Sequence, residues 1–114
     1  MNVDEWKSQL KRGTLEFAIL ELIGGKPRYG YELICELEKW PILTAKESTI
    51  YPLLRRLQKD GCLSSFWQDS AEGLPPRKYY TMTKAGQEYL SAMETEWQTL
   101  VSAITQMQGE KKHE

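Results

Sequence analysis

Hydrogen-bond donors and cations gather in two short stretches of this sequence, residues 46–61 and residues 77–82. Their side chains are Ser48, Thr49, Tyr51, Arg55, Arg56, Lys59, Arg77 and Lys78. Hydroxyl and guanidinium groups can distinguish base edges when they are held in fixed positions, whereas a phosphate oxygen needs only a donor or a positive charge. The two stretches therefore carry the side chains that contact with a nucleic acid requires.

The chemistry of these side chains predicts different contacts for them. Three offer positioned donors for base readout: Ser48, Thr49 and Arg55. Three cations suit phosphate contacts: Lys59, Arg77 and Lys78. Tyr51 lies near the same helix end as Ser48, and Arg56 follows along the exposed side. Tyr29, which begins another predicted helix, is placed to add a phosphate contact near the positive end of that helix dipole.

The charge of the whole chain does not by itself favour this partner. The net charge over 114 residues is −1, and phosphate binders usually show a basic footprint. The local distribution matters more, because salt screens charges that lie more than about 10 Å apart. Acidic residues concentrate in residues 4–38 and 88–96, whereas the two basic stretches lie between them.

The remaining bulk features exclude several classes of protein. The length suits about one domain, and no apolar run approaches the roughly 18 residues of a membrane span. No signal peptide begins the chain, so we expect a cytoplasmic protein. Cys35 and Cys62 lack CxxC spacing and only His113 could join them, so we expect no metal and no cofactor. Inert, buried thiols are the expectation for both cysteines, with a redox sensor as the alternative.

The hydrophobic pattern predicts the elements that position these side chains. A first helix covers residues 3–23, with a possible bend at Gly13, and residues 24–27 (GGKP) end it. A second helix covers residues 29–40 and ends at Pro41. Tyr31 in this helix is expected to pack inside the protein rather than to act in a site.

A third helix is predicted over residues 45–60, with a buried stripe at i, i+3, i+4 and i+7 that consists of Ile50, Leu53, Leu54 and Leu57. Thr44 and Glu47 fit a capping box at its start. Pro52 cannot donate to the Ser48 carbonyl, a loss of roughly 3 kcal/mol inside a plain helix. The helix therefore begins either near Ser48 or at Thr44 with a bend at Pro52.

A change of period after Gly61 predicts a β-hairpin. Residues 62–68 and 77–82 are rich in strand-forming types, and the loop between them contains Gly73, Pro75 and Pro76. Tyr79 and Tyr80 must face opposite sides of a strand, so one of them is expected in the core. Thr83 is the expected N-cap of a last helix. We divide the chain into a DNA-binding domain at 1–83, a dimerisation helix at 84–108 and a disordered tail at 109–114.

The last predicted helix has the spacing of a helix–helix seam. Apolar residues follow one another in alternating steps of three and four: Leu90, Met93, Trp97, Leu100, Ile104 and Met107. A helix over 84–108 is roughly 37 Å long, which is too long for so small a domain to cover. We therefore expect a homodimer built on this seam and on the first helix.

Together these elements predict a mainly α fold with a small β-hairpin, namely a winged helix-turn-helix with a long C-terminal dimerisation helix. In this fold the third helix enters a DNA major groove about 12 Å wide, and the hairpin approaches the neighbouring backbone or minor groove. A two-fold dimer then requires an inverted repeat with half-sites about one helical turn apart.

Three motifs in order, YGYEL, TIYPLLRRLQKDG and PPRKYYTMTKAG, resemble the PadR family of bacterial transcriptional regulators, in its short branch with a single C-terminal helix. The resemblance covers residues 15–104. It implies a dimeric repressor, often of transporter or stress genes, on an inverted repeat with ATGT/ACAT-like halves. The DNA contacts that it implies fall on Tyr29, Ser48, Thr49, Tyr51, Arg55, Lys59, Arg77 and Lys78. Because many members have a proline at position 52, the resemblance favours a helix that begins at Thr44 and bends.

Trp97 raises the hypothesis of a ligand site. A bulky indole in the seam hinders tight packing against its symmetry mate, and helices that part there would leave an apolar slot; a filled, rigid core is the alternative. Some short members of the family bind flat aromatic drugs near tryptophans here. The candidate lining is Trp97, Met93, Leu100, Phe17 and Leu10, and a planar ligand would loosen DNA binding by changing the angle between the wings.

Two other classes of function remain to be compared with a DNA-binding repressor. A winged-helix module that uses its basic face for another protein is the alternative function. An enzyme is not expected, because the sequence has no Ser/His/Asp or Cys/His constellation and no glycine-rich phosphate loop.

Overall fold

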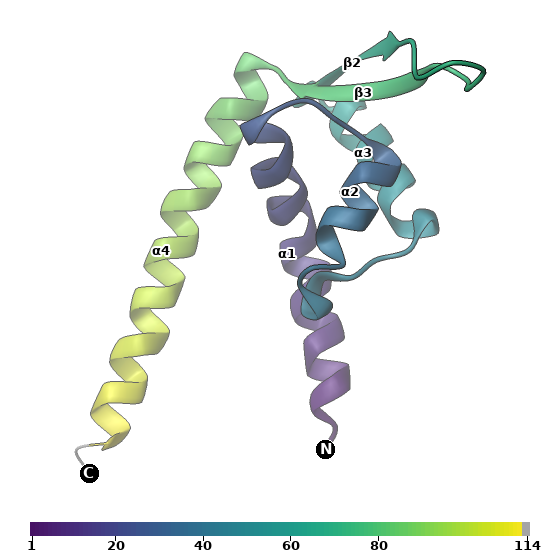
Figure 1. Cartoon of the computed structure of the whole chain (residues 1–114). Coiled ribbons are helices and arrows are strands. Elements are labelled where there is room, and N and C mark those ends of the chain that lie inside the picture. Colours follow the sequence, from purple (N-terminus) through teal and green to yellow (C-terminus); the bar gives the residue numbers. More distant parts are fainter. Residues whose placement is uncertain (113–114) are drawn as a thin grey trace.

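The computed structural model describes residues 1–112 as four helices and a small antiparallel sheet (Figure 1). In chain order the elements are α1 (Val3–Gly25), β1 (Arg28–Tyr29), α2 (Gly30–Leu37), the 3-10 turn η1 (Pro41–Leu43), α3 (Glu47–Lys59), β2 (Leu63–Gln68), β3 (Arg77–Met82) and α4 (Lys84–Lys112). The predicted fold class, mainly α with a hairpin and a long C-terminal helix, is confirmed.

The core lies where α1, α2, α3 and one face of the sheet meet. Its fully buried side chains include Ile19, Leu20, Leu33, Leu37, Ile50, Leu54 and Leu57. Three of the four residues in the predicted α3 stripe are thus buried, and the fourth, Leu53, lies half-buried at the edge that faces α1. Tyr80 is buried and Tyr79 is not, as the alternation along a strand predicts.

The first two helices differ from their predicted bounds. α1 runs through Gly13 without a break, and Asn2 caps it by accepting a hydrogen bond from the Asp4 backbone nitrogen at 2.8 Å. α2 is shorter than predicted at both ends, because Tyr29 belongs to β1 and α2 ends at Leu37. The strand β1 pairs with β3, so the sheet has three strands in the order β1-β3-β2. A two-residue strand has no periodicity to detect, which is why the sequence predicted only the hairpin.

The predicted capping box at Thr44 is wrong. Thr44 follows η1 and donates its backbone N–H to the Pro41 carbonyl, and α3 begins at Glu47 with Lys46 at the N-cap and no side-chain cap. The helix therefore begins near Ser48, and the alternative that starts at Thr44 is wrong. Pro52 lies in the second turn of α3, where it leaves the Ser48 carbonyl without its usual i+4 donor.

The hairpin joins α4 through a tight corner. In the hairpin, β2 pairs with β3 from Leu63↔Met82 to Gln68↔Arg77. Thr83 caps α4 as predicted, since its Oγ1 accepts from the Gly86 backbone nitrogen at 3.0 Å and donates to the Gly61 carbonyl at 2.6 Å. A Cβ at Gly86 would collide with the Cys62 carbonyl, so this approach of helix to hairpin depends on glycine.

The helix α4 packs against α1 over its first half, as far as Trp97, and diverges from it toward its C-terminal end (Figure 1). It reaches Lys112, so residues 109–112, which were predicted to be a disordered tail, are helical; His113 and Glu114 lie outside the described residues. Leu90 is buried against α1 beside Gly24. No helix within residues 1–112 has both the length and the hydrophobicity needed to cross a bilayer.

Candidate nucleic-acid interface

The side of α3 that points away from the core carries Ser48, Arg55 and Lys59, all of which are exposed. Separations of seven and four residues place them on one side of the helix. Within residues 1–112, no carboxylate lies within ion-pair distance of Arg55 or Lys59. We call these three residues the exposed face of α3. Their donors and charges are available to an external partner.

Tyr51 is less accessible than predicted. Its ring is half-buried and lies over Gly30, where a Cβ would collide with it. Burial raises the pKa of the Tyr51 phenol above its usual value, and the nearby Glu47 carboxylate adds to this effect. The hydroxyl therefore stays protonated at neutral pH. The main role that this geometry gives Tyr51 is to set the position of α3 against the start of α2.

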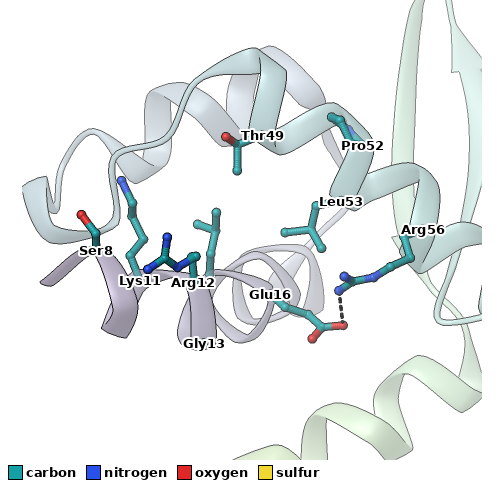
Figure 2. Close-up of a pocket in the computed structure, with 10 residues that line it drawn as sticks. Ser8, Lys11, Arg12, Gly13, Glu16, Thr49, Pro52, Leu53 and Arg56 are labelled. Atoms are coloured by element: carbon teal, nitrogen blue, oxygen red, sulfur yellow. Dashed lines mark ion pairs between the residues drawn. The ribbon is translucent and has the colours of Figure 1, made fainter. Parts of the chain in front are cut away.

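Two other predicted residues, Thr49 and Arg56, lie on the side of α3 that faces α1, at the edge of a groove between the two helices (Figure 2). The Arg56 guanidinium pairs with the Glu16 carboxylate at 3.2 Å. Arg55 and Arg56 are adjacent in sequence but point about 100° apart. The polar side predicted as one surface is thus divided into two.

The outer face of the sheet positions Arg77. Its guanidinium lies over the Tyr29 ring, 4.6 Å from the ring centre. Tyr29 packs edge-on against Tyr79, and Tyr79 stacks on Phe66 with ring centres 5.5 Å apart. Tyr29 is the N-cap residue of α2, as the prediction of a helix start implied, but its side chain makes no capping hydrogen bond and instead supports Arg77.

Lys78 lies on the opposite face of β3 from Arg77. Its Nζ is 5.5 Å from the centre of the buried Tyr80 ring, and it pairs across the hairpin with Trp67. Trp67 is 69% exposed, which is the largest exposure among the aromatic residues of the sheet and marks this edge as open to solvent. The hairpin of β2 and β3 is the wing of the fold. Its two cations, Arg77 and Lys78, therefore reach different faces of the wing.

Comparison with known proteins identifies the family. The model of the transcriptional regulator PadR-like family matches residues 19–92. The chain belongs to this family. It is therefore a PadR-like, DNA-binding transcriptional regulator with a winged-helix fold. Members of this family are transcriptional regulators and not enzymes, which confirms the prediction on enzymatic activity.

Solved structures of PadR-like regulators resemble this chain along most of its length. A PadR family transcriptional regulator from Eggerthella lenta DSM 2243 is 33% identical with a TM-score of 0.81, covering 92% of this chain and 90% of its own. A PadR-like transcriptional regulator from Bacillus cereus strain ATCC 14579 is 35% identical with a TM-score of 0.79, covering 87% and 95%. An uncharacterized protein of Lysinibacillus sphaericus is 38% identical over 93 residues, which are 80% of this chain and 84% of that protein.

An apolar cavity of about 340 Å³ lies between α1, η1 and Trp97 of this PadR-like chain. Its lining is Leu10, Lys11, Thr14, Phe17, Ala18, Glu21, Ile42, Leu43 and Trp97. The Trp97 and Phe17 ring centres are 5.8 Å apart. Of the predicted ligand residues, Leu10, Phe17 and Trp97 line this cavity, whereas Met93 and Leu100 are not part of its lining.

One acidic group of the cavity is electrostatically unusual. The pKa of the Glu21 carboxyl is raised, first by partial burial and then by the neighbouring Glu94 carboxylate on α4. Sequence reasoning missed Glu21, as well as Ile42 and Leu43 of η1. The signal available for η1 was Pro41, which was interpreted only as a helix stop.

The predicted dimer seam divides into two parts. Leu90 is buried within its own chain, and Met93 packs beside the core. Beyond them Leu100, Ile104 and Met107 are exposed, together with Val101, which sequence reasoning did not select. In residues 1–112 nothing covers this distal part of α4, so its apolar stripe is available to a second chain.

The remaining side chains singled out from sequence have plain environments. Tyr31 is exposed, so the expectation that it packs inside the protein is wrong. Its pKa is raised mainly by a hydrogen bond with Cys35 one turn away. Cys35 is exposed rather than buried, whereas Cys62 is half-buried and its thiol pKa is raised by burial. Among the described residues, no cluster of His, Cys, Asp or Glu could hold a metal ion.

Proposed function

We propose that this PadR-like chain is a dimeric repressor that binds an inverted-repeat operator beside transporter or stress genes in the cytoplasm. The observation that carries this proposal is the exposed face of α3, where Arg55 and Lys59 have no ionic partner among the described residues. A guanidinium free of carboxylates retains its donors for base edges in a major groove.

Each predicted contact now has a role that fits its environment. Ser48 and Arg55 are the residues for base readout, and Lys59 contacts the backbone beside them. Thr49, which sequence chemistry also suited to base readout, lies at the edge of the groove beside α1 and is better placed for a backbone contact. Arg77 and Lys78 contact phosphates from the two faces of the wing. Tyr51 and Tyr29 act through their neighbours, since one ring packs on Gly30 and the other supports Arg77.

The distal stripe of α4 supports a two-fold homodimer. Leu100, Ile104 and Met107 repeat at steps of four and three, and together with Val101 they would be covered by the same helix of a second chain. In such a dimer the two α3 helices would enter successive major grooves, about 34 Å apart. This spacing is the reason for proposing an inverted repeat.

The cavity beside Trp97 supports a regulatory ligand. Its volume of about 340 Å³ and its aromatic walls suit a flat apolar molecule. Such a molecule releases the operator only if it binds the DNA-free shape of the dimer more tightly than the DNA-bound shape. The Trp97 side chain extends from α4 to Phe17 of α1. A ligand beside it is therefore placed to alter how α4 packs against the DNA-binding domain.

The experiment is a mobility-shift titration of the full chain with a duplex from the intergenic region beside its own gene. Binding should weaken by about a thousandfold between roughly 50 and 200 mM salt, because counterions are released from several phosphates. Arg55→Ala should cost about 1–3 kcal/mol of binding free energy, whereas Lys111→Ala, at the far end of α4, should bind as the wild type does. Affinity that is insensitive to salt and to Arg55→Ala would favour the alternative of a protein-interaction module.

A further inference from the structure

A groove lies on the side of α3 that the β2–β3 hairpin, the wing, does not cover. This groove, about 730 Å³, separates α1 from α3 (Figure 2). Its lining is Ser8, Lys11, Arg12, Gly13, Leu15, Glu16, Thr49, Pro52, Leu53 and Arg56. Hydroxyls and cations from both helices border it, with Leu15 and Leu53 between them.

The groove has an excess of positive charge. It contains three cations, Lys11, Arg12 and Arg56, and one carboxylate, Glu16. The single carboxylate is already paired with Arg56 at 3.2 Å. Lys11 donates to a backbone carbonyl, and Arg12 has no carboxylate within ion-pair distance among residues 1–112. Two positive charges therefore remain unneutralised in a chain whose net charge is −1.

The groove and the wing lie on opposite sides of α3. On the wing side of α3, the Gln58 amide donates to the Ser65 hydroxyl of β2 at 2.9 Å. Gln58 and Arg56 point about 160° apart on the helix, so the groove and the wing flank α3 on opposite sides. A helix seated in a major groove about 12 Å wide has a phosphate backbone on each side. The wing offers cations to one backbone, and α1 offers them to the other.

We propose that the α1–α3 groove is a second backbone-binding site, in which Arg12 and Lys11 hold phosphates of the DNA strand that flanks each half-site on the side away from the wing. The inference rests on the proposed DNA-binding function and adds α1 to the interface. Ser8 and Thr49 supply neutral donors at the two edges of the groove. The ligand is the sugar–phosphate backbone, so these contacts add affinity without sequence preference.

The ion pair between Glu16 and Arg56 limits what the groove can bind. Arg56 is directed to α1 by the Glu16 carboxylate, and a phosphate must compete with that carboxylate for the guanidinium. Replacing Glu16 by glutamine removes the competing charge and the repulsion between Glu16 and a phosphate. Glu16→Gln should therefore bind DNA more tightly than the wild type, by about threefold or more.

The test uses fluorescence anisotropy of the full-length protein with two labelled duplexes of about 30 bp, long enough for two half-sites one helical turn apart. One duplex has a random sequence, and the other comes from the intergenic region beside the gene. Arg12→Ala should weaken binding of both by about fivefold to tenfold and lower the salt slope by about one per protomer. Lys111→Ala removes the same charge at the far end of α4 and should change neither quantity.

The outcomes separate this inference from the function on which it rests. If Arg55→Ala weakens binding while Arg12→Ala keeps the wild-type affinity and salt slope, the groove is not a backbone site and the proposed function stands. If Glu16→Gln binds no more tightly than the wild type, competition by Glu16 is refuted. If the wild type binds neither duplex at low salt, both the proposed function and this inference are refuted.

Discussion

Lys11 of α1 donates a hydrogen bond from its Nζ to the Thr44 carbonyl, 2.8 Å away, and so ties the first helix to the segment that leads into α3. The same side chain lines the apolar cavity beside Trp97, the α1–α3 groove and a third hollow around Thr44–Lys46. Because α3 has no side-chain cap of its own, this contact from α1 helps to hold the segment that precedes its start.

Removing that contact should loosen the beginning of α3. We expect Lys11→Met to lower the free energy of unfolding by about 1 kcal/mol and to speed amide exchange at Thr49 and Ile50, whose N–H groups bond to the Lys46 carbonyl. Lys7→Met is the matched control, since Lys7 lies one turn earlier on α1 and forms only an exposed ion pair with Asp4. Equal exchange in both variants would show that the contact does not hold α3.

Substitutions of Tyr29 can distinguish two roles for it: a ring that supports Arg77, or a hydroxyl that binds a phosphate. If the ring acts by positioning the Arg77 guanidinium, Tyr29→Phe should keep the DNA affinity, and Tyr29→Ala should lose about threefold, as expected for a cation–π contact of roughly 0.5–1 kcal/mol. Binding curves for the two variants on the intergenic duplex measure this. A loss in Tyr29→Phe as large as in Tyr29→Ala would instead assign the hydroxyl a direct contact.

A planar dye that binds in the cavity beside Trp97 should quench the fluorescence of Trp97. Titration with Hoechst dye should lower the emission of the wild-type protein, and Trp97→Phe should lose most of that change, since the remaining tryptophans do not line the cavity. Thr14→Ala, which alters a small polar part of the lining, serves as a variant that keeps the aromatic wall. Identical quenching in the wild type and in Trp97→Phe would place the dye elsewhere.

The two glycines at positions 86 and 13 should respond in opposite ways to alanine. Gly86→Ala should destabilise the protein by about 1–3 kcal/mol, because its Cβ collides with the rigid Cys62 backbone carbonyl. A Cβ at position 13 has no neighbouring atom within 4 Å, so Gly13→Ala should stabilise α1 by up to about 1 kcal/mol through helix propensity. Urea denaturation of the two variants measures both; a neutral Gly86→Ala would mean that the corner between β3 and α4 can relax.

Glu21 should make the free energy of unfolding decrease as the pH rises through its folded-state pKa. Its pKa is raised in the folded chain by burial and by Glu94, so the folded state holds this proton more tightly than the unfolded state. Its contribution to stability is therefore fully present below the ordinary pKa of 4.5 and is lost as the pH rises through the folded pKa. Glu21→Gln should raise Tm at pH 7, and the difference should disappear in acid.

The long-range contacts of the site could not be predicted from the sequence. The ion pair between Glu16 and Arg56 and the hydrogen bond between Lys11 and Thr44 join residues that are far apart in the chain. Such contacts depend on where two helices cross, and no short-range pattern encodes that crossing. For the same reason, Arg55 and Arg56 were placed on a single surface although α1 removes one of them from it.

What the sequence determined by itself was local. The spacing of Ile50, Leu54 and Leu57 predicted the buried side of α3, and the position of Thr83 predicted the cap of α4, because these patterns involve residues within a few positions of one another. The tertiary structure decided the rest. The turn η1 took up the residues before Thr44 and moved the start of α3 to Glu47, and β3 recruited Tyr29 into a strand, because packing and pairing with distant segments outweigh a weak local preference.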